Sequence, residues 1–192
     1  MSEQVAHIPR EAVAHIDGYE PGAEIDSRDI RFSRESKVET QDDRVEVVTY
    51  TVVWQRPSRV LVGQRLDEAA EPRLHGDSFI GWGGHARRLD REKAGERFVQ
   101  CAAEREFREE LDASGAKGTA AESYQGAIYH PINDVCRDHF AFVFLVEATE
   151  AEVRETDKYH GVWRPADSMP PSSQFEPWSR LLLSHLEGMI DD

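Results

Sequence analysis

The stretch that decides the fold is Ala-Ala-Glu-Arg-Glu-Phe-Arg-Glu-Glu-Leu, residues 102–111. In a helix, Glu106, Glu109 and Glu110 stand at positions i, i+3 and i+4 and lie along one side. Like charges at this spacing cost a helix about 0.2–0.5 kcal/mol per pair, so the helix gains nothing from them. A hard divalent cation such as Mg²⁺ prefers carboxylate oxygens, and the pattern therefore indicates a metal site.

The residues before this helix favour a metal site over the simpler alternative, a solvated face linked by ion pairs with Arg105 and Arg108. An apolar segment, residues 79–82, runs directly into Gly83 and Gly84. A double glycine lets the backbone turn sharply and brings bare amide and carbonyl groups close to an ion or a phosphate.

Together these residues resemble the signature of the Nudix hydrolases. That signature is a Gly, five residues, a Glu, seven residues, Arg-Glu-apolar, one residue, Glu-Glu, one residue, then a Gly and an apolar residue. Its core matches Arg-Glu-Phe-Arg-Glu-Glu at residues 105–110, after the small pair at 102–103.

The periphery departs from the family pattern. Counting back from Arg105 places the first Glu of the signature at Arg97, with Glu96 one residue out of register. The stretch from Gly84 to that position is seven residues longer than in the family, and Asp112 replaces the closing Gly.

The resemblance extends to a branch of the family whose members are often labelled phosphoesterases. It covers roughly residues 28–186 and includes 73–76 (Arg-Leu-His-Gly), 83–85 (Gly-Gly-His), 132–134 (Ile-Asn-Asp) with His139, and 175–179 (Phe-Glu-Pro-Trp-Ser).

The resemblance implies an α/β fold, a Nudix-like α/β/α sandwich with a mixed central sheet. It implies metal-dependent hydrolysis of a diphosphate bond in a nucleoside-diphosphate-linked or related small molecule, with Mg²⁺ or alternatively Mn²⁺ as cofactor. The expected metal ligands are Glu106, Glu109, Glu110 and the Gly84 carbonyl.

Catalytic roles are expected for Glu106, Glu109 and Arg105. Arg105 would hold a glutamate in position through a bidentate pair. One of the glutamates, or a later acidic residue such as Glu155 or Asp157, would accept the proton of the attacking water. For the last two, an ordinary exposed carboxylate is the simpler interpretation.

Several other side chains carry two interpretations each. Arg65 would bind a phosphate or stand as a surface arginine. His85 and His139 would act as acid or base, although a hydrogen-bonded structural role is favoured for both. Trp82 and Phe140 would stack on a base, although core packing is favoured.

Length and composition suit one globular protein with a small-molecule substrate. A chain of 192 residues is long enough for a real core, and two cysteines form no disulfide framework. The net charge of −14 argues against partners such as nucleic acid or an anionic membrane. No signal peptide is visible, so we expect a cytoplasmic protein; a homodimer is compatible with the sequence.

The expected elements alternate between strands and helices. We expect residues 1–43 to form an N-terminal extension, with a short helix over 8–16, that packs on a Nudix hydrolase domain at 44–192. Within that domain we expect strands at 45–54, 60–64, 124–130, 139–147 and 161–164, the last at an edge. A solvent loop at 86–95, a helix at 96–111 with Ala103, Phe107 and Leu111 facing the core, and a final helix at 173–189 complete the prediction.

A non-catalytic Nudix-fold domain that binds a nucleotide-like ligand as a sensor or regulator remains the alternative. The altered loop and Asp112 leave it open, whereas three mutually repelling glutamates favour an enzyme, because a pure binder has little reason to keep them. An isomerase of the same fold is less favoured, because no cysteine is placed for that chemistry.

Overall fold

The computed structural model describes residues 3–34, 38, 41–69, 72–113, 116–117 and 123–191. One large mixed sheet forms the centre, with strand order β13-β5-β4-β11-β10-β2 along its main path. These strands are β13 (Tyr159–Pro165), β5 (Arg59–Arg65), β4 (Arg44–Gln55), β11 (His139–Ala148), β10 (Tyr124–Tyr129) and β2 (Gly18–Pro21).

The two long strands β4 and β11 run parallel to each other in the middle of the sheet, with His139 opposite Glu46 and Glu147 opposite Trp54. Both are nearly continuous runs of β-branched and aromatic residues, and both are buried along almost their whole length. Long buried runs that are mostly apolar are typical of parallel strands covered on both faces. The predicted strands at 45–54 and 139–147 are therefore confirmed.

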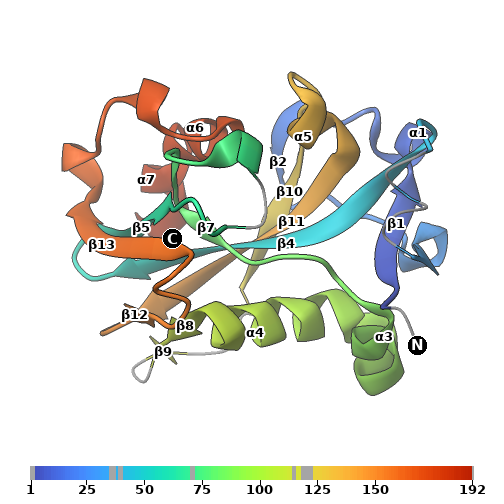
Figure 1. Cartoon of the computed structure of the whole chain (residues 1–192), viewed down its shortest axis with the longest axis horizontal. Helices are drawn as coiled ribbons and strands as arrows, with labels where there is room; N and C mark the ends of the chain where they lie inside the picture. Colours follow the sequence, from blue (N-terminus) through green and yellow to red (C-terminus); the bar gives the residue numbers. More distant parts are fainter. Residues whose placement is uncertain are drawn as a thin grey trace.

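Helices cover both faces of the sheet (Figure 1). On one face, α4 (Phe98–Glu110) packs Phe98, Ala103 and Phe107 against β4 residues such as Val47 and Val53. On the other face, α6 (Pro177–Leu183) and α7 (Leu186–Asp191) join a second apolar cluster that includes the alternate β4 residues. The expected α/β/α sandwich with a mixed sheet is confirmed.

The first 43 residues contribute strands to this same sheet. Strand β1 (Val5–Pro9) pairs with β4 and with β3 (Arg31–Ser33), while β2 pairs with β10. The helix expected over 8–16 is shorter, α1 (Arg10–Val13), because Ile8 and Pro9 belong to β1. The division at residue 43 into an extension and a domain stays a prediction.

Two other expectations are wrong. The charged segment 86–95 is a helix for most of its length, α3 (Arg88–Ala94), because the buried Asp90 carboxylate accepts the Arg87 amide at 2.8 Å and caps it. The final helix is two helices, α6 and α7, separated where the Ser184 hydroxyl donates to the Leu181 carbonyl at 2.6 Å. By contrast, Ala103, Phe107 and Leu111 are buried as predicted, and β13 lies at the end of the strand order.

Short elements complete the fold. They are β6 (Ser78–Phe79), β7 (Gly81–Trp82), β8 (Leu111–Asp112), β9 (Ala116–Lys117), β12 (Glu152–Val153), α5 (Asp134–Asp138) and the 3₁₀ turns Ser27–Asp29, Pro72–Leu74, Gly95–Arg97, Ala166–Ser168 and Ser172–Gln174. No helix among the described residues combines the length and apolar character needed to cross a bilayer.

Candidate metal centre and substrate cavity

A glycine loop joins the sheet to the helix that carries the glutamates. After β7, the Gly84 carbonyl accepts the Thr49 amide at 2.9 Å, which holds the loop against β4. Gly83 has φ of 154°, and a Cβ there would lie 2.2 Å from the Thr49 carbonyl oxygen. A Cβ on Gly84 would lie 2.8 Å from Glu106 Oε2. Both positions therefore need glycine, and Gly84 is in direct contact with the acidic helix.

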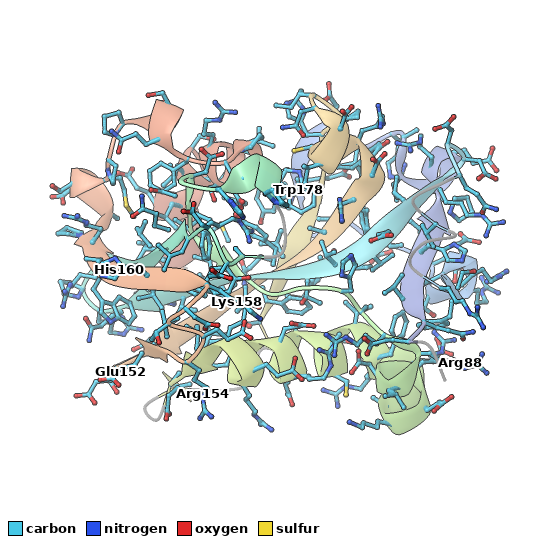
Figure 2. The ribbon with its side chains drawn as sticks, viewed as in Figure 1. Arg88, Glu152, Arg154, Lys158, His160 and Trp178 are labelled. Carbon is cyan, nitrogen blue, oxygen red and sulfur yellow. The ribbon has the colours of Figure 1, made fainter. Side chains whose placement is uncertain are left out.

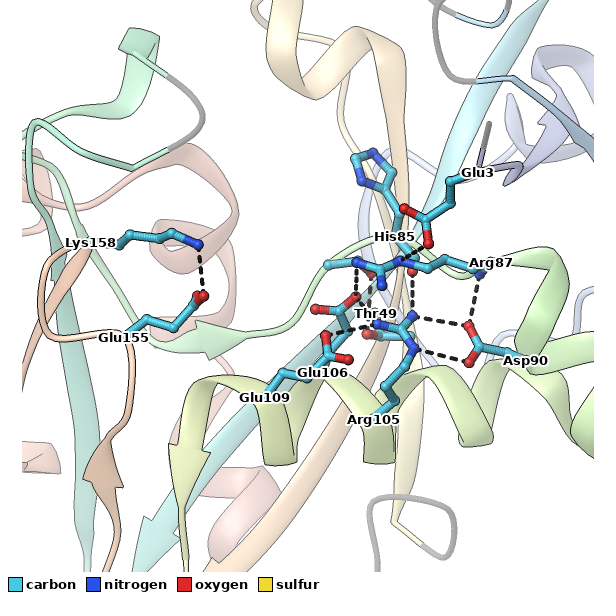
Figure 3. Close-up of polar contacts among 11 residues, drawn as sticks. Glu3, Thr49, His85, Arg87, Asp90, Arg105, Glu106, Glu109, Glu155 and Lys158 are labelled. Carbon is cyan, nitrogen blue, oxygen red and sulfur yellow. Dashed lines mark hydrogen bonds and ion pairs between the residues drawn. The ribbon is translucent and has the colours of Figure 1, made fainter. Parts of the chain in front are cut away.

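The Arg105 guanidinium organises the acidic residues (Figure 3). Its Nε and Nη2 donate to the two oxygens of Asp90, each at 3.0 Å, and Nη2 also donates to the His85 carbonyl at 2.9 Å. Its Nη1 donates to Glu109 Oε2 at 3.1 Å and contacts Glu106. A planar fork bonded on all sides fixes the orientation of the two glutamates it touches.

Asp90 is a member of this network that the sequence analysis missed. Its carboxylate is fully buried and forms the bidentate pair with Arg105. Counting forward from Gly84, rather than back from Arg105, places Asp90 at the first acidic position of the signature. The extra residues follow Asp90, where α3 continues and the 3₁₀ turn Gly95–Arg97 is added.

Glu96, the near-register residue, lies outside the network. Its side chain is 71% exposed and accepts from Arg91 Nη2 at 3.0 Å, with a further contact to the Ser27 hydroxyl.

The three glutamates differ in their surroundings. Glu106 is buried and lies between Arg105 and Arg87, whose Nη2 is 3.5 Å from Glu106 Oε1. Glu109 has a side chain that is 49% exposed, so water reaches it. Glu110 is buried, and its Oε2 has no hydrogen-bond partner among the described residues.

Burial, followed by the charge of Glu106, raises the pKa of Glu110 to about 8, although Arg65 and a backbone hydrogen bond from Gly83 oppose the shift. A buried carboxylate of this kind is stabilised when a cation approaches it.

Arg65 is committed to an internal ion pair. Its Nη2 lies 3.3 Å from Glu176 Oε2, and its guanidinium stacks over Phe79 and Tyr159 at 4.9 and 5.8 Å from the ring centroids. Glu176 Oε1 also accepts the Tyr50 hydroxyl at 2.6 Å. Arg65 is therefore not a plain surface arginine, although it borders the cavity described next.

A cavity of about 490 Å³ opens beside the glycine loop. Its wall includes Trp178, which lies on the α6 side of the sheet (Figure 2). Other wall residues are Arg65, Gly83, Gly84, His85 and His139. None of the three α4 glutamates is among the described residues that line it. The structure thus groups Arg65 and both histidines at the cavity, and groups the glutamates with Arg105, with Gly84 common to both places.

Both histidines contact a residue that the sequence analysis did not single out, Glu46. His85 Nε2 lies 2.5 Å and His139 Nε2 lies 3.6 Å from Glu46 Oε2. Burial is the main cause that lowers the pKa of His139, which favours its neutral form. The residues meet because the register between β4 and β11 places His139 opposite Glu46. No pattern of residues in the sequence shows this register.

The remaining candidate residues are paired, exposed or in the core, and so are less suited to a role in catalysis or substrate binding. Glu155 pairs with Lys158 at 2.7 Å (Figure 3), and its charge contributes to the raised pKa of Glu110. Asp157 is exposed. Trp82 and Phe140 are fully buried in the core, as favoured from the sequence.

Comparisons with known proteins identify the fold. No protein-family model matches the chain. Protein YmaB of Bacillus subtilis (strain 168) is 24% identical over 153 residues, which cover 77% of this chain and 74% of YmaB. The crystal structure of Tm1382, provisionally assigned to the Nudix hydrolases, matches with a TM-score of 0.78 and 21% identity over 97% of this chain and 100% of Tm1382.

A Nudix hydrolase from Alicyclobacillus acidocaldarius matches with a TM-score of 0.53 and 15% identity over 74% of this chain and 90% of that protein.

Proposed function

We propose that this chain, which has the fold of the Nudix hydrolases, is a metal-dependent hydrolase that cleaves a diphosphate bond in a small, nucleoside-diphosphate-linked molecule. The observation that carries the proposal is the Arg105 network, which orients Glu106 and Glu109 beside the buried Glu110. A surface ion-pair ladder would not bury two of three neighbouring glutamates.

The carboxylate and carbonyl oxygens of this group fit a hard divalent cation, and we expect Mg²⁺, with Mn²⁺ as the alternative. Glu106, Glu109 and Glu110 would hold it. The Gly84 carbonyl, which accepts the Thr49 amide at 2.9 Å and the Thr49 hydroxyl at 3.4 Å, would exchange the longer of these hydrogen bonds for the cation. Oε2 of Glu110 has no hydrogen-bond partner among the described residues, and this supports the fit, because an unpaired buried oxygen is costly without a cation or a donor. When bound, the metal supplies charge neutralisation on the phosphates and a lower pKa for the attacking water.

The side chains have separate roles in this proposal. Arg105 is a positioning residue, held by Asp90 and holding the glutamates. Glu109, the half-exposed glutamate, takes the proton from the attacking water. The cavity beside Gly84 receives the organic part of the substrate against Trp178, with Arg65 at its wall as the candidate phosphate contact.

The partner in this proposal is a small molecule. The net charge of −14 gives nucleic acid no basic footprint to bind, and the cytoplasmic location and any homodimer remain predictions from the sequence.

The test is a substrate panel of nucleoside triphosphates, sugar nucleotides, dinucleoside polyphosphates and dinucleotide cofactors with Mg²⁺ or Mn²⁺. We expect a phosphate-containing product from at least one compound, and none in EDTA. Glu109→Gln should lower kcat by about 10² or more, in line with the loss of electrostatic stabilisation at a reacting centre.

Glu104→Gln is the matched control, since this glutamate is on the same helix and its Oε2 lies 3.9 Å from Arg108. Equal turnover by Glu109→Gln and the control would contradict the assignment. Ligand binding without turnover would instead support the alternative, a sensor or regulator.

A further inference from the structure

A second group of metal-ligating side chains lies outside the α4 site. Glu46 comes from β4, His85 from the loop before α3, and His139 from the first position of β11. One potential ligand atom from each lies within 4.8 Å of the other two. The strand pairing explains the convergence, because His139 is directly opposite Glu46 and His85 bridges to Val48 two residues further along β4.

The buried carboxylate of this group is only partly hydrogen-bonded within the part of the chain that the structure describes. Glu46 is only 3% exposed, and its Oε1 is buried with no hydrogen-bond partner among the described residues. A buried, unpaired carboxylate oxygen costs folding free energy, and native proteins seldom leave one without a partner or an ion.

A hydrogen bond to the backbone fixes the tautomer of His139. Its Nδ1 lies 2.7 Å from the Val135 carbonyl oxygen, which can only accept, so Nδ1 carries the proton. The bare Nε2 of His139 therefore faces Glu46 Oε2 at 3.6 Å, and two acceptors confront each other. A metal-binding histidine has this arrangement, with one nitrogen donating to a carbonyl and the other free for the ion.

The group is on the opposite side of the sheet from the α4 glutamates. Glu46 alternates with Val47 along β4 and shares a face with Val48 and Tyr50, which pack in the apolar cluster of α6 and α7. In Figure 3 the His85 ring points away from α4, while its carbonyl accepts from Arg105. Both histidines and Glu46 also line the cavity.

We propose that Glu46, His85 and His139 form a second metal site, selective for Zn²⁺ or a similar transition-metal ion, with an open position toward the cavity. Two imidazoles and one carboxylate suit such an ion better than Mg²⁺, which prefers oxygen ligands. Three protein ligands and one open position are also the pattern of catalytic zinc sites. The site goes beyond the proposed function and does not depend on it.

The first experiment measures zinc bound to the full chain after removal of metal with EDTA, addition of Zn²⁺ and desalting. We expect one tightly held equivalent in the wild type, and Co²⁺ in place of Zn²⁺ should give visible d–d absorption bands. In Glu46→Gln and His139→Ala, affinity for Zn²⁺ should fall about 100-fold or more, since removing a ligand costs at least as much as the 10–100-fold typical of outer-shell losses.

Two controls separate this site from others. His160→Ala removes an exposed histidine and should leave zinc binding unchanged. Glu109→Gln should also retain zinc even if it abolishes hydrolysis, so failure of one proposal is distinguishable from failure of the other. His85→Ala, at a side chain 28% exposed, serves if a buried variant fails to fold.

No zinc on the wild type, or full zinc binding by Glu46→Gln, His139→Ala and His85→Ala, would overturn the proposal.

Discussion

Replacing Glu110 with Gln in the metal-free protein should remove a distinct pH dependence of stability. The folded-state pKa is raised from 4.5 to about 8, mainly by burial. Between these values the folded protein keeps a proton that the unfolded chain has lost, so the free energy of unfolding falls as pH rises. Each pKa unit corresponds to about 1.4 kcal/mol, so the full effect is on the order of 4–5 kcal/mol.

The assay is urea denaturation in EDTA between about pH 6 and about pH 8, over which linkage predicts a loss of about 2 kcal/mol from Glu110. The difference in the free energy of unfolding between the wild type and Glu110→Gln isolates the contribution of Glu110 from those of other groups. One of these is His139, whose lowered pKa makes the free energy of unfolding rise with pH. Glu109→Gln, at a half-exposed position, is the control and should keep the slope of the wild type. The same slope in wild type and Glu110→Gln would show that the Glu110 carboxyl does not keep its proton in the folded protein over this pH range.

Further predictions concern Gly84 and Asp90. Gly84→Ala places a Cβ 2.8 Å from Glu106 Oε2, so we expect Mn²⁺ affinity to fall about tenfold or more, as outer-shell disturbances typically cause. Gly188→Ala, which meets no atom within 4 Å, should bind Mn²⁺ as the wild type does in the same titration, and equal affinities for both variants would disprove the steric argument. Asp90→Ala leaves the Arg105 guanidinium without its main partner, so the free energy of unfolding should fall by about 3–5 kcal/mol. Urea denaturation checks this value, and a loss below about 1 kcal/mol, the range of an exposed pair, would show that the pair is not structural.

Local sequence patterns predicted much of the fold, because the spacing of apolar and charged residues within one strand or helix reflects which of its faces is buried. The runs that became β4 and β11 and the stripe of α4 were readable in this way. The prediction of a loop at the charged segment 88–94 was wrong. Asp90 is buried there because it forms an ion pair with Arg105, which lies in the next helix. Charge content alone does not show which acidic residue will be buried.

The candidate site was predictable only where one helix carries it. Glu106, Glu109 and Glu110 follow from helical spacing, whereas Asp90 required the choice of counting forward from Gly84. The cluster of Glu46 with two histidines depends on the register between β4 and β11, and strand register is decided by the packing of the whole sheet.

The most direct measurement is an anomalous difference map from crystals of the wild-type chain soaked in MnCl₂. If the carboxylates of α4 hold a divalent cation, as we propose, the map will contain a manganese peak bound by oxygens of Glu106, Glu109 and Glu110. No peak at these oxygens, or a peak at Glu46 alone, would contradict this proposal.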